Sequence, residues 1–174
     1  MKNIFIIICI SISFFGCKTE TEKSIDETNK LINQIDKKQE ASKRADELVE
    51  NSTKKFYTDT IGLGNSPVKV YNSKFIEKEY SNYKDIVLYY KNISKENISA
   101  IRFEWYGENA FNEPAEMGSY GLKGVGGGFS DEVLKAGKST SGTWEINSID
   151  GKKIISARAF EVIFEDGTKW KLRN

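Results

Sequence analysis

The stretch RAFEVIFEDGTKWKL, residues 158–172, carries the clearest fold signal in the chain. Two runs of alternating apolar and polar residues flank Asp166-Gly167, which is typical of a β-hairpin. A two-residue turn would pair Glu165 with Thr168 and divide the large apolar side chains between opposite faces. A three-residue loop that ends in a left-handed Gly167 pairs Phe164 with Thr168 instead. We predict this bulged loop, because register follows the buried face and the loop brings five large side chains together: Phe160, Val162, Phe164, Trp170 and Leu172.

Alternating patterns continue upstream of this hairpin. Residues 99–106 (SAIRFEWY) place Ile101, Phe103 and Trp105 on one side of a strand, with charged residues on the other. Further strands are predicted at 68–71, 85–91 and 143–146. Several short strands without βαβ spacing predict an all-β fold over residues 61–174, organised as an antiparallel β-sandwich.

Three turns in this region resemble turns of small bacterial immunoglobulin-like domains. They are NISKENI at 92–98, LKAGKS at 134–139 and FEDGTKW at 164–170. FxLYD-type lipoprotein domains and related families of unknown function share this arrangement, and the resemblance covers about residues 67–174. It implies an immunoglobulin-like sandwich and no particular activity. The chain departs from the family after Trp105, where GENAFNEP and a glycine-rich continuation replace an Asp-x-x-Gly hairpin.

Residues 1–16 have the organisation of a secretory signal. Lys2 supplies the positive charge, and the apolar run from Ile4 to Phe15 is shorter than the roughly 20 residues that span a membrane. The following FFGC resembles the lipobox of bacterial lipoproteins, in which signal peptidase II cuts before a cysteine that carries diacylglycerol and acyl chains such as palmitate. The resemblance implies lipidation of Cys17 and attachment to a membrane. The alternative is an ordinary secretory signal with an incidental cysteine.

The residues that follow Cys17 bear on the location in the cell envelope. KTETE, residues 18–22, resembles stretches that send some Gram-negative lipoproteins to the outer face of the outer membrane. We therefore expect a lipid-anchored envelope protein, at the outer membrane. Both the periplasmic side and the cell surface remain open as the side on which it lies.

Residues 17–60 are predicted to form a polar tether. Residues 18–55 contain neither Gly nor Pro, and charges of both signs are interleaved, as on a solvated helix. Ile25, Ile32 and Ile35 have helical spacing, but polar residues follow where a coiled coil needs apolar side chains. We predict a tether that is partly helical and partly disordered. An oligomer is expected only under the alternative in which this segment forms a coiled coil.

Charge and cysteine content exclude several classes. The chain has 26 Lys and Arg against 25 Asp and Glu, whereas a nucleic-acid binder needs a basic surplus or stripe. No nucleic-acid partner is therefore predicted. Cys9 lies in the signal and Cys17 would be lipidated, so no internal disulfide is expected and the core must stabilise the domain.

The glycines at 124–128 and Gly137-Lys-Ser-Thr suggest a phosphate-binding loop at first sight. Such a loop has its first glycine five residues before the second, and that position holds Glu132, whose charge would repel phosphate. The following residues read as a strand where the loop requires a helix. We predict no nucleotide and no other cofactor, a flexible connection at 124–128, and a turn at 134–140 that begins the strand of Trp144.

Catalytic signals are weak. The chain has no histidine, which removes the usual zinc sites and Ser-His-Asp triads. We predict no metal ligands, no catalytic residues and no enzymatic activity. The alternative is a hydrolase of envelope polymers that uses paired carboxylates, for which the candidates are Glu104, Glu113, Glu116, Asp131 and Glu132.

Tyrosines are the candidate binding residues, because an aromatic ring with a polar tip suits contacts with proteins or sugars. We predict a partner-binding role for Tyr83, Tyr89, Tyr106 and Tyr120. The alternative is that most of them pack at sheet edges or under loops. The sequence thus predicts a non-catalytic binding sandwich for a protein or a glycan, with a purely structural envelope component as a further alternative.

Overall fold

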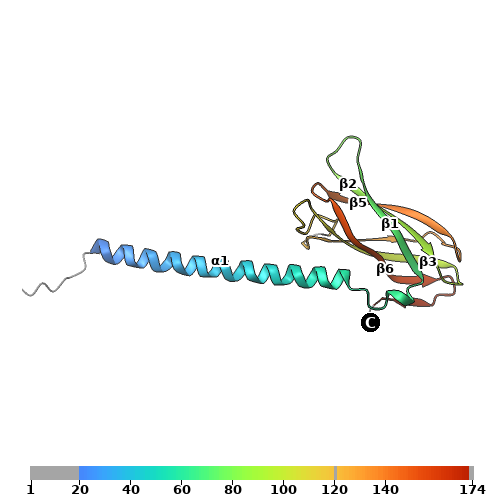
Figure 1. Cartoon of the computed structure of the whole chain (residues 1–174), viewed down its shortest axis with the longest axis horizontal. Helices are drawn as coiled ribbons and strands as arrows, with labels where there is room; N and C mark the ends of the chain where they lie inside the picture. The colour runs from blue at the N-terminus through green and yellow to red at the C-terminus, as the bar shows by residue number, and fades with distance from the viewer. Residues whose placement is uncertain (1–19, 120, 173–174) are drawn as a thin grey trace, which may run out of the picture. The chain divides into compact units, whose positions relative to one another are not determined.

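The computed structural model describes residues 20–119 and 121–172. The predicted signal peptide at 1–16, Cys17 and Tyr120 lie outside these residues. A helix precedes two antiparallel β-sheets, which pack as a sandwich (Figure 1). The three-stranded sheet has the order β1-β2-β5, and its strands are β1 Val68–Glu77, β2 Lys84–Asn92 and β5 Ser139–Ser148. The four-stranded sheet has the order β4-β3-β6-β7, with β4 Val125–Ser130, β3 Ile98–Glu108, β6 Lys153–Phe164 and β7 Lys169–Lys171.

Helix α1, Glu20–Thr58, is continuous over 39 residues. The sequence predicted a segment that is only partly helical. Strong helix formers such as Glu, Lys, Gln and Ala dominate the segment, and no Gly or Pro interrupts it. Ile25, Ile32 and Ile35 are exposed on it. Residues up to Asp46 form one compact unit, whereas Glu47–Asn174, which includes the end of α1, forms a second.

Within the described residues, none of the helices carries an apolar stretch long enough to cross a bilayer.

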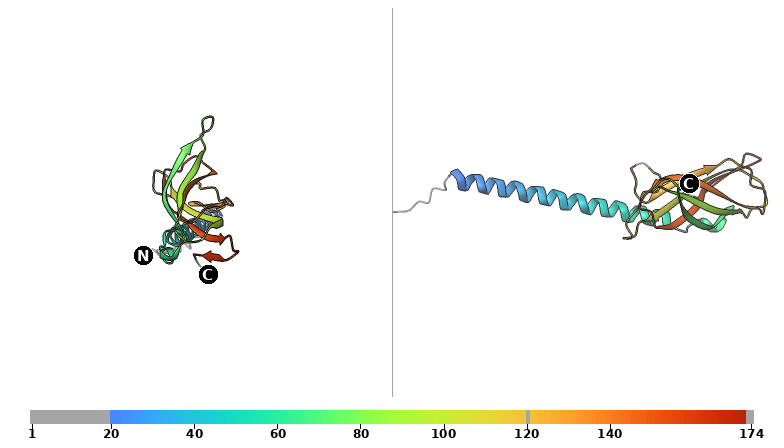
Figure 2. Two further views of the ribbon diagram at one scale, coloured as in Figure 1. Left: turned by 90° about the vertical axis from the view of Figure 1, so that its right-hand side faces the viewer. Right: turned by 90° about the horizontal axis from the view of Figure 1, so that it is seen from above.

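The core lies between the two sheets, which Figure 2 shows from two further directions. Ile86, Leu88 and Tyr90 of β2 face Ile101, Phe103 and Trp105 of β3, as the alternating pattern predicted. Aromatic contacts cross between the layers. The ring centroids of Tyr90 and Phe103 are 4.7 Å apart, and those of Phe103 and Trp144 are 5.3 Å apart. Aromatic pairs at such distances add stabilisation beyond their buried area.

The register predicted for the C-terminal hairpin is confirmed. The backbone N–H of Phe164 donates to the carbonyl of Thr168 at 3.0 Å, and Gly167 closes the loop with a φ of 85°. Val162, Phe164 and Trp170 pack on the core. The expected common face was wrong for Phe160 and Leu172, which line an outer pocket with Glu104. A bulge in the β3–β6 pairing leaves Phe160 as the extra residue and redirects its side chain.

The predicted flexible connection at 124–128 is corrected by the structure, because Val125 to Gly128 belong to strand β4. Its glycines make room for large aromatic side chains. A Cβ at Gly126 would overlap the indole of Trp105, and one at Gly128 would meet the indole of Trp144 at 2.5 Å. Trp144 also donates from Nε1 to the carbonyl of Phe129 at 3.0 Å, which ties β5 to β4. The glycines therefore serve packing.

The turn after β2 is organised by Asn92, whose side chain is fully buried. Its Nδ2 donates to the carbonyls of Glu96 at 2.8 Å and Leu134 at 2.9 Å. Its Oδ1 accepts from the backbone N–H and the hydroxyl of Ser94. One amide thus satisfies four backbone and side-chain groups and joins two loops. The turn predicted at 134–140 is confirmed, and it leads into β5 at Ser139.

Candidate functional site

The end of α1 contacts the outer face of the four-stranded sheet through Arg158. Glu104 and Arg158 are register partners on β3 and β6, and Nε of Arg158 donates to Oε1 of Glu104 at 2.8 Å. The guanidinium also donates to the carbonyl of Phe56 at 3.0 Å and to that of Asp59. A guanidinium suits this position because carbonyls at a helix end lack helical partners and carry partial negative charge.

Two further contacts hold the same helix end. The hydroxyl of Ser156 donates to the carbonyl of Tyr57 at 2.8 Å. Nζ of Lys54 lies 2.5 Å from Oε1 of Glu108, whose side chain is almost buried. Backbone and side-chain groups of α1 are therefore both engaged by the sheet.

Tyr106 lies on the same face and is buried. Its ring stacks with that of Tyr57 at a centroid distance of 6.4 Å. Its hydroxyl has no hydrogen-bond partner among the described residues. Burial, together with the carboxylates of Glu108 and Glu50, raises the pKa of Tyr106 to about 12. The phenol therefore stays neutral and serves packing.

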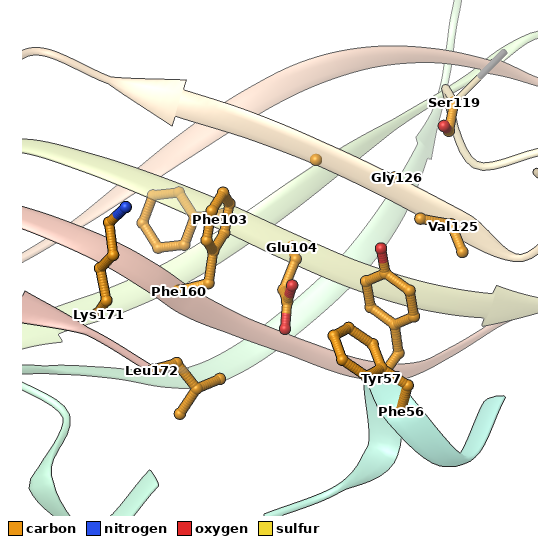
Figure 3. A pocket seen from close by; sticks show the side chains of 11 residues that line it. Phe56, Tyr57, Phe103, Glu104, Ser119, Val125, Gly126, Phe160, Lys171 and Leu172 are labelled. Atoms are coloured by element: carbon orange, nitrogen blue, oxygen red, sulfur yellow. The ribbon is translucent and has the colours of Figure 1, made fainter. Parts of the chain in front are cut away.

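A pocket of about 530 Å³ opens beside this contact (Figure 3). In this view, Phe56 and Tyr57 lie on one side, Phe160 and Leu172 on the other, and Glu104 between them. Polar groups lie at its margins, and the backbone of β4 completes the lining. We call this the α1-end pocket, and its lining consists of Phe56, Tyr57, Phe103, Glu104, Ser119, Val125, Gly126, Gly127, Phe160, Lys171 and Leu172.

A second pocket of about 470 Å³ lies further along β3, next to Arg102. Phe129 of β4 and Ile163 of β6 supply apolar walls. Arg102 is paired with Glu161 at 2.9 Å, and Glu161 also meets Lys171 at 3.4 Å. Because Arg102 and Glu104 point to the same side of β3, both pockets belong to the outer face of this sheet.

The structure does not gather the tyrosines predicted to bind a partner. Tyr106 is covered by the end of α1, and Tyr89 lies on the three-stranded sheet beside Tyr71. Tyr83, in the connection between β1 and β2, is 43% exposed. The structure therefore places the three described tyrosines at separate locations, and the side chain of Tyr106 is buried and not accessible to a partner.

The sequence did not single out Phe56 and Tyr57 as site residues. A signal was present, because these two adjacent aromatic residues directly follow a polar segment, 18–55, that contains no aromatic residue. On an exposed helix such a pair would remain in water. Their position therefore indicated a contact with the folded domain.

The carboxylates proposed for a hydrolase are dispersed. Glu104 is tied to Arg158 in the α1-end pocket, and Glu113 lies in a turn organised by Asn109. Glu116 lines a different pocket, and Asp131 and Glu132 follow β4 at exposed positions. Within residues 20–119 and 121–172, no group of three or more Cys, Asp or Glu side chains could hold a metal ion.

No family model matches the chain, and no curated protein resembles it in sequence. Three solved structures are distantly similar to it. A hypothetical protein from Peptoclostridium difficile 630 has a TM-score of 0.46 at 11% identity, covering 62% of this chain and 87% of its own. The structural genomics target SoR45 has a TM-score of 0.33 at 11% identity, covering 60% and 79%. The trimeric lipoprotein SadB of Salmonella enterica has a TM-score of 0.37 at 19% identity, covering 83% and 87%.

Proposed function

We propose that this chain is a lipid-anchored protein of the cell envelope whose immunoglobulin-like sandwich is a non-catalytic module that binds a protein partner. The anchor would be diacylglycerol on Cys17, and the outer membrane the site of attachment. The FFGC motif after the apolar run supports the anchor. The three turn motifs and the two antiparallel sheets support the immunoglobulin-like assignment.

The binding function is inferred from the lining of the α1-end pocket. Aromatic and leucine side chains provide apolar area, and Ser119 and Lys171 provide polar groups at its edge. This composition is typical of the centre and rim of protein interfaces. The one carboxylate of the pocket, Glu104, is held by Arg158 at 2.8 Å, which is the arrangement of a structural ion pair.

The occupant that fits is an apolar or aromatic side chain of the partner. A volume of about 530 Å³ exceeds that of any single side chain, so neighbouring residues of the partner would also enter. The walls come from α1, β6 and the residue after β7, and all three are held by backbone hydrogen bonds or by Arg158. A site fixed in this way limits the ordering cost of binding.

Photo-cross-linking in intact cells tests the binding function. A photoreactive residue at Ser119, on the pocket, should give a discrete adduct, whereas one at Lys95, exposed on the turn after β2, should not. Phe160→Ala should reduce the adduct formed from Ser119. Equal adducts from both positions, or an adduct that Phe160→Ala leaves unchanged, would contradict a partner in this pocket.

The anchor is tested separately. Cys17→Ser removes the acyl acceptor and should release the protein from the membrane fraction. Unchanged fractionation would contradict the lipid anchor and leave the pocket experiment unaffected.

A further inference from the structure

The outer face of the three-stranded sheet carries lysines that the fold does not need. Lys69 of β1 and Lys91 of β2 lie directly opposite each other, and both are exposed. Like charges at directly opposite positions destabilise a sheet. Lys74 lies on the same face, with Nζ 5.6 Å from the ring centroid of Tyr89. None of the three lysines is paired with a carboxylate of the described residues.

Two tyrosine rings lie among these lysines. A bulge between Val70 and Asn72 places Tyr71 next to Tyr89, with centroids 6.4 Å apart and planes inclined by 46°. Tyr71 is the bulge residue of β1, and its side chain is 53% exposed. The bulge therefore presents an aromatic surface beside the lysines.

The edge strand β5 adds hydroxyl groups to this face. Ser141 lies opposite Tyr89 and Thr143 opposite Val87, and both are exposed. The acidic residues of the face, Asp85 and Glu145, lie at its far end, where Lys78 pairs with both at 3.3 and 3.2 Å. Positive charge, aromatic rings and hydroxyls thus occupy one end of the face, whereas its two carboxylates lie at the other end, where Lys78 pairs with them.

We propose that this basic tyrosine face, defined as Lys69, Tyr71, Lys74, Tyr89 and Lys91, binds an anionic polysaccharide. Sugar rings would stack their C–H groups on the tyrosines, lysines would pair with the acid groups of the polymer, and Ser141 and Thr143 would hydrogen-bond its hydroxyls. The charge calls for an anion. The exposed hydroxyls of Ser141 and Thr143 favour a sugar ligand over a membrane surface, because binding to a membrane surface depends on apolar side chains that insert into it. The face is on the opposite sheet from the α1-end pocket, so neither proposal depends on the other.

The test measures binding of the full-length protein in detergent micelles to immobilised alginate, dextran sulfate and phosphomannan, with neutral dextran as the reference. We expect retention on at least one anionic polymer, weakening as salt rises. Tyr71→Ser should weaken it roughly two- to tenfold, the range of a single aromatic contact. Tyr71→Phe, which keeps the ring, should bind as the native chain does.

A matched charge control separates this face from general attraction. Lys69→Gln/Lys91→Gln should weaken binding, whereas Lys123→Gln/Lys152→Gln, at two other exposed lysines, should not. The first double variant should unfold at the same or a higher urea concentration, because it removes a like-charge pair.

Four results would overturn the proposal. They are no retention on any anionic polymer, equal losses from the two double variants, no effect of Tyr71→Ser, and competition by polyglutamate as strong as that by the polysaccharide. Binding of the Cys17→Ser chain to phosphatidylglycerol vesicles that is stronger than its binding to the polysaccharides, and that Tyr71→Ser weakens, would assign the face to lipid instead.

Discussion

Arg158 and Glu104 form an ion pair of 2.8 Å across β6 and β3, and their side chains are only 6% and 11% exposed. The same guanidinium holds the carbonyls of Phe56 and Asp59. One arginine therefore joins two strands to the end of a helix. A buried ion pair of this kind is costly to break because each partner leaves a charge behind.

Arg158→Met should lower the free energy of unfolding by about 3–5 kcal/mol, since it leaves the Glu104 carboxylate buried without its cation. Urea unfolding followed by tryptophan fluorescence measures this, because Trp105, Trp144 and Trp170 all lie in the sandwich. Arg102→Met is the matched control: the Arg102 side chain is 64% exposed, so a loss of about 1 kcal/mol or less is expected. A similar decrease in the free energy of unfolding for both variants would show that Arg158 stabilises the domain no more than an exposed arginine does.

Gly126→Ala should destabilise the sandwich by about 1–3 kcal/mol. The added methyl would overlap the carbonyl of Met117 and the indole of Trp105, which are hydrogen-bonded to each other at 3.0 Å. Gly64→Ala is the control, because no atom lies within 4 Å of its added Cβ. Thermal unfolding of the two variants compares them, and equal melting temperatures would show that β4 can move away from Trp105.

Asn92→Ala should cost more than about 2 kcal/mol, because it leaves the buried carbonyl of Leu134 without its donor and the turn without its acceptor. Asn72→Ala, at an exposed position on β1, should change stability by less than about 0.5 kcal/mol. Urea midpoints measure both. A small effect at Asn92 would mean that water replaces the side chain in the turn.

The stability of the protein should fall as the pH rises from about 10 to about 12, partly through Tyr106. Its pKa in the folded protein is about 12, against about 10 in an unfolded chain. The unfolded chain loses the proton first, so the stabilisation is complete below pH of about 10 and disappears as the pH approaches about 12. Tyr106→Phe should remove this part of the decrease and leave stability at neutral pH unchanged or higher. Urea midpoints measured across this pH range compare the two proteins. A parallel decrease of the midpoints of the native chain and of Tyr106→Phe would contradict the role given to Tyr106.

The sheet elements were largely predictable because their patterns are local. The hairpin at 158–172 could be assigned to one register, since only that register places Val162, Phe164 and Trp170 on the same face. Residues 99–106 alternate without interruption. Strand β4 was missed because its glycines have low strand propensity, and their use becomes apparent only once Trp105 and Trp144 lie against them.

The candidate sites were less predictable because they depend on contacts between distant segments. Phe56 meets Arg158 across 102 positions in the chain. The burial of Tyr106 could not be read from the sequence, because the burial of a strand residue depends on what covers the sheet. The pair of Lys69 and Lys91 requires the register of β1, and the bulge at Tyr71 that adds a ring to the same face has no distinct pattern in the sequence.

The attachment of α1 to the sheet also has a mechanical consequence. Tension applied along the chain from its N-terminal side would reach the guanidinium of Arg158 and the hydroxyl of Ser156 before it reached the covalent link into β1. These groups hold the helix end from two positions on one strand, β6, whose neighbours β3 and β7 lie on either side of it. The load would thus be distributed over the middle of the four-stranded sheet. Strand β1, at the edge of the other sheet, would not be pulled away from β2 first.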